Sequence, residues 1–326
     1  MRVIDDVRSV GREIGDADAR LLSAARGRRA WALLRTDPLF WVGATLVSIA
    51  IAVALFAPIL APYDPLHQFR RDGLSPTGDP LGPSAKFLLG TDRSGRDYLS
   101  RLIFGARTSI AIALISNAVA TTLGVAVGAV AAYARSPRIG IPGTPIRFGV
   151  PVEAVLMRIT DLALAFPVLL LAIALAAVLG PSIGLVILVI TSVNWATTSR
   201  IVYGRVSVLR DADFVDAAEA SGVGSARILV RHILPHVIPL AIVYAALGIA
   251  ATILFETTLS FLGAGVPAPA PTWGTMIADH ISWYATDPRL VVLPGVAIML
   301  TVLGFSLLGD SLRDALDPRT ASGSVA

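Results

Sequence analysis

The chain has 326 residues, of which 55% are hydrophobic and only 15% are charged, whereas soluble domains carry about 25% charged residues. The formal net charge is +4, and the basic residues lie mostly beside long apolar runs, which indicates membrane orientation rather than nucleic-acid binding. The absence of cysteine excludes disulfides, thiolate metal sites and cysteine nucleophiles.

Residues 1–37 form a mixed-charge segment that contains eight arginines. A cleavable signal peptide has a shorter charged region and a shorter apolar core, so we expect this segment to remain cytoplasmic. The predicted first transmembrane helix, 38–60, contains no charge from Leu39 to Leu60. At about 1.5 Å per residue, that run can cross about 30 Å of hydrocarbon.

The segment 61–107 is predicted to be an extracytoplasmic loop. Its first part is rich in proline, and its last part, from Ser94 to Arg107, alternates apolar and charged residues near helical spacing. This pattern predicts a short amphipathic helix that lies on the outer membrane surface.

Five further apolar runs lie in the predicted core, 108–312: Ile110–Ala132, Leu162–Leu179, Ile183–Ala196, Val237–Leu262 and Leu290–Leu308. Backbone groups inside a bilayer must bond to one another, so these runs are expected to be helices. The predicted fold class is therefore all-α integral membrane, with six transmembrane helices.

Local residues add expectations about these spans. Gly124 and Gly128 are four residues apart and predict a face for close helix packing. Three prolines, Pro167, Pro239 and Pro294, are expected to kink their helices.

Basic residues set the expected orientation. With six spans and a cytoplasmic N-terminus, the inner segments hold 18 Lys and Arg residues and the outer segments hold eight. This bias places the tail 313–326 and the loop 200–235 on the cytoplasmic side.

The loop 200–235 contains a predicted helix–turn–helix. Asp213 is expected to cap its first helix, Gly222 and Gly224 to form a turn with positive φ, and Ser225 to cap its second helix. The small side chains beside Asp216 suit docking into a partner's groove, although the residues alone equally allow a hairpin lying on lipid.

Three polar residues lie in or near spans: Asp161, Asn194 and Glu256. Such residues either line a pathway or join helices. For Asp161 and Glu256 we favour structural pairing or solvation near helix ends, Asp161 with Arg158 or Arg200, and for Asn194 an interhelical hydrogen bond. No residues suggest a catalytic, metal or cofactor site.

The loop resembles the signature of ABC importer permeases, which reads E-A-A, three residues, G, nine residues, I-x-L-P. Its matching positions are Asp216, Ala217, Ala218, Gly222, Leu234 and Pro235, and Ile233 stands one place after the isoleucine of the pattern. Aspartate replaces glutamate at 216, and His232 stands where the general pattern has isoleucine. The sequence His-Ile-Leu-Pro and three further motifs, between residues 38 and 319, resemble the dipeptide/oligopeptide branch.

This resemblance implies a type I ABC importer permease fold, with a cytoplasmic coupling helix and a long extracytoplasmic loop after the first span. It implies a non-catalytic pore subunit in the bacterial cytoplasmic membrane, with both termini cytoplasmic. The implied partners are a homologous permease, two cytoplasmic ATPases that hold ATP and magnesium, an extracytoplasmic substrate-binding protein and a di- or oligopeptide. We expect the long outer loop to touch the binding protein because it is too large for a connector.

Other function classes fit less well. A permease of the same family for nickel or another small solute would have a similar pore. A stand-alone channel or secondary transporter would need no docking hairpin. An intramembrane enzyme would need a motif such as His-Glu-x-x-His or Gly-x-Ser-x-Gly. A chain that binds ATP itself would need a phosphate loop. None of these three motifs occurs in the sequence.

Overall fold

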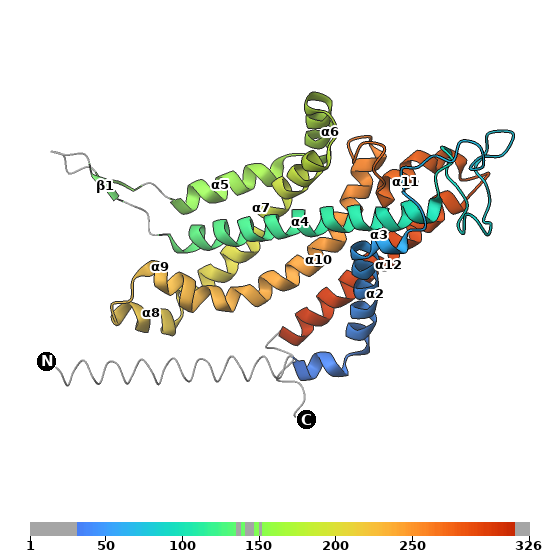
Figure 1. The fold of residues 1–326 in the computed structure, drawn as a ribbon. Coiled ribbons are helices and arrows are strands. Elements are labelled where there is room, and N and C mark those ends of the chain that lie inside the picture. The colour runs from blue at the N-terminus through green and yellow to red at the C-terminus, as the bar shows by residue number, and fades with distance from the viewer. Residues whose placement is uncertain (1–30, 135–137, 141–146, 150–151, 317–326) are drawn as a thin grey trace.

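The computed structural model of the chain describes residues 31–134, 138–140, 147–149 and 152–316 (Figure 1). The predicted N-terminal segment 1–37 lies outside the described residues as far as position 30. The predicted tail 313–326 lies outside them from position 317.

The described residues are mostly helical, as the sequence predicts. The helices are α2 (Pro38–Leu55), α3 (Ala57–Leu60), α4 (Tyr98–Tyr133), α5 (Val152–Ala165), α6 (Val168–Leu179), α7 (Ile183–Arg210), α8 (Asp213–Ala220), α9 (Ser225–Ile228), α10 (Leu234–Phe261), α11 (Trp273–His280) and α12 (Arg289–Leu316). A π-helical turn, Leu229–Ile233, joins α9 to α10, and a 3-10 turn, Ile281–Trp283, follows α11.

A pair of β-strands was not predicted from the sequence. Two short antiparallel strands, β1 (Arg138–Gly140) and β2 (Arg147–Gly149), form a hairpin between α4 and α5, with Ile139 paired to Phe148. This hairpin adds to the predicted helical fold without changing the order of the spans.

Within the described residues, five helices are long and apolar enough to cross a membrane, and the bent pair α5 and α6 makes a sixth if it is one span. The predicted third span, Leu162–Leu179, is not one straight helix, because α5 and α6 meet at a bend of 80°. Pro167 explains the break, since it has no N–H and disfavours helical backbone at the preceding Phe166.

The predicted surface helix from Ser94 to Arg107 is wrong. Asp97 caps α4 by accepting from the Ser100 backbone N–H at 2.8 Å, and the helix then runs unbroken for 36 residues. Its first turns are covered by protein instead of lying on lipid. Tyr98 is fully buried and packs with Met276 and Leu290.

Close packing of α4 on α7 forms the centre of the bundle. An added Cβ at Gly124 would lie 2.5 Å from Thr198 Cβ, and one at Gly128 would lie 2.4 Å from the Ser199 carbonyl oxygen. The predicted glycine face is therefore confirmed, and its partner is a helix of the same chain. Nearer the start of α4, helices α2, α10 and α12 pack together around Val47, Ile253 and Phe305.

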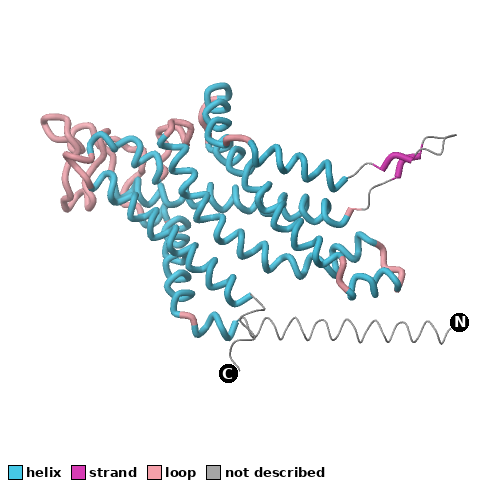
Figure 2. The backbone as a smooth tube through the Cα atoms, turned by 180° about the vertical axis from the view of Figure 1, so that it is seen from behind, coloured by secondary structure: helices cyan, strands magenta, loops and turns pink. Residues whose placement is uncertain are grey.

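Helix α4 connects two ends of the molecule. Figure 1 shows the loop that precedes α4, together with α11, at one end, and α8 and α9 at the other. The same separation is visible from behind in Figure 2. The loop that precedes α4 and the two short helices α8 and α9 thus lie at opposite ends of the bundle.

Candidate functional site: the hairpin between α7 and α10

The first helix of the hairpin, α8, follows directly from the end of α7. Arg210 Nη1 donates to the Ala132 carbonyl oxygen of α4 at 2.8 Å, so the end of α7 is fixed to the last turn of α4. The N-cap of α8 is Ala212, which makes no side-chain cap bond, so the prediction that Asp213 caps this helix is wrong. Asp213 and Asp216 instead lie in the first turn, where a negative charge is favoured by the helix dipole.

Gly222 ends α8 in the left-handed region, with φ of +76°. Its N–H donates to the Glu219 carbonyl at 2.9 Å, and the Val223 N–H donates to the Ala218 carbonyl at 3.1 Å. This is a Schellman ending, in which glycine at the position after the cap avoids the steric penalty of a side chain. An added Cβ would have no neighbour within 4 Å, so the requirement for glycine is one of backbone conformation rather than space.

Gly224 differs from Gly222, and its predicted positive φ is wrong. It adopts φ of −67° and ψ of 145° as the N-cap of α9, so Ser225, which was predicted to be the cap, is instead the first helical residue. An added Cβ at Gly224 would also have no neighbour within 4 Å. The two glycines therefore lie in the same open turn with different backbone demands.

A buried apolar cluster fixes the hairpin to the bundle; we call it the anchor. It joins α4, α7, α8, α9, the π-helical turn and α10 through Ala129, Ala132, Tyr133, Val202, Val206, Val215, Ile228, Ile233 and Val237. Val215, Ile228 and Ile233 are each no more than 1% exposed. Burying such side chains contributes about 1.5–3 kcal/mol each, so the hairpin is held firmly against α4, α7 and α10.

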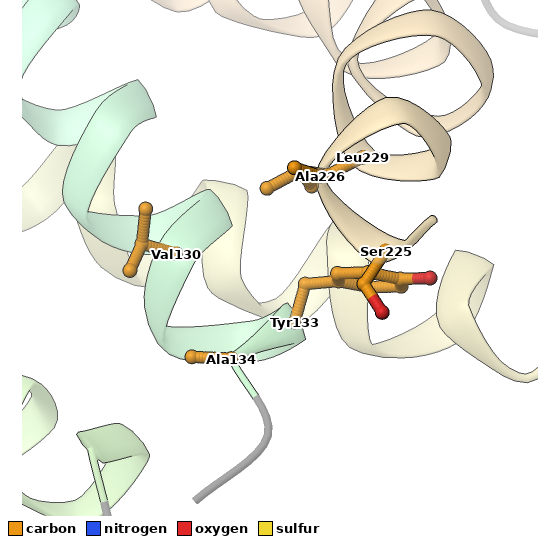
Figure 3. Close-up of a pocket in the computed structure, with 6 residues that line it drawn as sticks. All are labelled: Val130, Tyr133, Ala134, Ser225, Ala226 and Leu229. Atoms are coloured by element: carbon orange, nitrogen blue, oxygen red, sulfur yellow. The ribbon is translucent and has the colours of Figure 1, made fainter. Parts of the chain in front are cut away.

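The hairpin is open where the anchor does not cover it. Its exposed residues include Asp216, Ala217, Ser221 and Ala226, together with the larger Phe214 and Glu219. Beside it, a hollow of about 200 Å³ is lined by Val130, Tyr133, Ala134, Ser225, Ala226 and Leu229. Figure 3 shows Val130 and Tyr133 of α4 on one side of this hollow and Ala226 and Leu229 on the other. Small residues allow a partner's backbone to approach closely.

The structure divides the seven predicted hairpin residues into two groups. Asp216, Ala217 and Gly222 are exposed, and Ala218 is half-buried. The remaining three are not part of α8 or its turn: Ile233 is buried in the anchor, and Leu234 and Pro235 begin α10. The anchor residue Val215 was not predicted, because no sequence signal distinguishes it from other apolar residues.

The three polar residues of the spans occupy different surroundings. Asp161 on α5 forms an ion pair with Arg200 on α7. Asn194 Nδ2 donates to Thr252 Oγ1 at 3.2 Å, between α7 and α10. Glu256 is 1% exposed, and its Oε1 accepts from Ser260 Oγ at 2.9 Å. The structure does not bring these residues together into one site.

Comparison with known families gives two matches. The family described as "Binding-protein-dependent transport system inner membrane component" matches residues 124–322. The family described as "N-terminal TM domain of oligopeptide transport permease C" matches residues 26–76. The hairpin lies inside the first match.

Curated relatives cover most of the chain. The dipeptide transport system permease protein DppC of Alkalihalophilus pseudofirmus is 37% identical over 295 residues, covering 90% of each chain. DppC of Escherichia coli K12 is 40% identical over 278 residues, covering 85% of this chain and 88% of that protein. The di/tripeptide permease DppC of Pseudomonas aeruginosa is 39% identical, covering 85% of this chain and 87% of that protein.

Solved structures agree on the fold. A chain in the structure titled "Inward facing conformations of the MetNI methionine ABC transporter" superimposes with a TM-score of 0.52. The match covers 67% of this chain and 96% of that one at 17% identity, so it concerns the fold alone.

Proposed function

Because this chain belongs to the family of binding-protein-dependent transport system inner membrane components, we propose that it is a pore subunit of an ATP-driven importer for di- and oligopeptides. The names of the curated relatives support the substrate: they are dipeptide, di/tripeptide or peptide permeases. Those names favour a peptide over nickel or another small solute.

The hairpin between α7 and α10 is the observation that carries this proposal. It presents an open face that includes Asp216 and Ala217, while the anchor fixes the hairpin to α4, α7 and α10. A stand-alone channel or secondary transporter needs no such rigidly held docking hairpin. A force applied by a partner at this face can therefore change the packing of the long helices.

The partners follow from this role. A homologous permease would complete the pathway, two cytoplasmic ATPases would press on the hairpins, and an extracytoplasmic binding protein would deliver the peptide. ATP and magnesium would be held by the ATPases, and this chain would be a non-catalytic subunit without a cofactor of its own.

The orientation is also part of the proposal. The hairpin faces the cytoplasm, and the loop 61–107 faces the outside of the bacterial cytoplasmic membrane, where it meets the binding protein. The N- and C-terminal segments, 1–37 and 313–326, are then both cytoplasmic. The separation of the hairpin and the long loop at opposite ends of α4 supports this arrangement.

The proposal is tested by comparing Gly222→Val with Gly224→Val. A non-glycine residue in the left-handed conformation costs about 1–2 kcal/mol, and more when it is β-branched. We therefore expect Gly222→Val to reduce peptide-stimulated ATPase activity at least about fivefold. Gly224→Val should retain it, because φ is negative there and the space is open.

The measurement uses the complex of this chain with its neighbouring permease, ATPase and binding-protein subunits in proteoliposomes. Equal stimulation in both variants would contradict the role of the turn. Failure of the wild-type chain to co-purify with any ATPase would contradict the importer function itself.

A further inference from the structure

Helix α5 has two exposed faces of different chemistry. Val155, Ile159 and Leu162 lie on one face and are 47–67% exposed, which suits lipid. At about 100° per residue, a second strip lies roughly a quarter turn away. Its members are Ala154, Arg158, Asp161 and Ala165, three of them exposed and Asp161 half-exposed.

Helix α7 continues this strip. Thr197, Arg200 and Gly204 are exposed and follow one another at intervals of three and four residues, so they share a face. The Asp161–Arg200 ion pair links the two helices, and both side chains remain accessible, 40% and 44% respectively. We call the residues of both helices the polar strip.

The polar strip carries an excess of positive charge. Asp161 and Arg200 neutralise each other, whereas Arg158 has no ion-pair partner among the described residues. Arg158 lies three residues before Asp161, so the two share a helix face. The strip therefore combines one carboxylate with two guanidinium groups, which is the arrangement that binds a second carboxylate.

The strip is unsuited to face lipid. Charged side chains inside a bilayer are costly and face a bundle interior or a water-filled cavity. The strip also ends at the break between α5 and α6, and broken helices are tolerated at membrane depth where protein or water surrounds them. The apolar face of α5 already provides a surface for lipid.

We propose that the polar strip forms part of the wall of the water-filled pathway and that the guanidinium groups of Arg158 and Arg200, beside Asp161, bind the carboxylate of a passing peptide. This inference rests on the importer function proposed above. The guanidinium group of Arg158 or Arg200 can bind a carboxylate with two hydrogen bonds. The negative charge of Asp161 repels that carboxylate and so keeps the site from retaining it.

The first test uses the natural absence of cysteine in the chain. Single cysteines are placed in the strip by Thr197→Cys and Gly204→Cys and on the apolar face by Ile159→Cys, in the assembled complex with proven uptake. A water-soluble, charged thiol reagent should modify both strip positions and leave Ile159→Cys unmodified. Strip cysteines as unreactive as Ile159→Cys would overturn the proposal, because lipid or the second permease would then cover the strip.

The second test concerns the charge. Arg158→Gln should reduce uptake of a free dipeptide about tenfold, the effect of losing one charged hydrogen bond, and Arg158→Lys should recover part of it. Co-purification with the other subunits should not change. Unchanged uptake in Arg158→Gln would refute carboxylate binding while leaving the importer function intact. Failure of the wild-type chain to assemble with any ATPase would refute both carboxylate binding and the importer function.

Discussion

At the scale of the residue, burial decides the chemistry of His280. This side chain ends α11, is 1% exposed, and packs edge-on against Tyr98 at a ring-centroid distance of 6.0 Å. Its Nδ1 lies 2.7 Å from the Met276 carbonyl oxygen, which can only accept, so Nδ1 carries the proton and donates. Burial lowers the pKa of His280, against the opposing effects of the Met276 carbonyl and nearby carboxylates.

A pH dependence follows from His280. The unfolded or locally opened segment takes up a proton near pH 6.5, whereas the folded segment does so only at lower pH. The stability of α11 should therefore be full above about pH 6.5 and decrease as the pH falls toward the folded pKa. Hydrogen exchange of residues 273–280, corrected for intrinsic rates, measures this effect.

The matched variants for this prediction are His280→Gln and His67→Gln. His280→Gln should abolish the extra opening at low pH, and His67→Gln, at an exposed position, should preserve it. The same pH dependence in both variants would show that another group titrates.

At the scale of the element, the hairpin depends on contacts across the bundle more than on its own sequence. Helix α8 has eight residues and α9 has four, whereas isolated helices shorter than about 12 residues are marginal in water. Packing must therefore hold them, and the anchor provides it through Val215 on α8 and Ile228 on α9, both buried. The position of the hairpin therefore depends on the anchor.

Ile228→Ala tests this dependence. Shortening a buried isoleucine should destabilise the local packing by about 2–5 kcal/mol, so hydrogen exchange of residues 213–228 should accelerate and peptide uptake per ATP should fall. Val230→Ala removes a side chain that is 63% exposed and should change neither quantity. Equal effects of the two substitutions would contradict the anchor.

At the scale of the whole molecule, the long loop is a folded cap fixed by buried charge. Asp92 is fully buried and lies 2.6 Å from Arg96 Nε and 3.2 Å from Arg101 Nε. Arg289, at the start of α12, donates through Nη2 to the Leu81 carbonyl at 2.6 Å and also contacts the Leu89 carbonyl. These contacts join the cap to α4 and α12, so this end of the bundle is one packed unit.

Asp92→Asn should release this cap. It leaves Arg101, which is 2% exposed, without a buried counter-charge. The free energy of unfolding should therefore fall by about 3–5 kcal/mol. Limited proteolysis within residues 61–97 should become faster, while the hairpin at the far end keeps its protection. Asp79→Asn, at an exposed loop position, should behave like the wild type; faster cleavage in that variant too would contradict the role of Asp92.

Features that depend on local chemistry were predictable from the sequence. Long apolar runs identified the spans, and Gly222 was predicted in the turn because positive φ is a property of one residue. The polar and apolar residues of the hairpin also predicted two helices and a turn. The predicted helix caps were wrong, because the N-caps are the residues just before Asp213 and Ser225, namely Ala212 and Gly224.

Only the tertiary structure decided what covers each face. Pro167 breaks a span, whereas Pro239 and Pro294 lie inside continuous helices, although the three share one local chemistry. The apolar stripe at Tyr98 is covered by α11 and α12 rather than by lipid. The physical reason is that periodicity shows which face is apolar, while the partner of that face is set by residues far away in the chain.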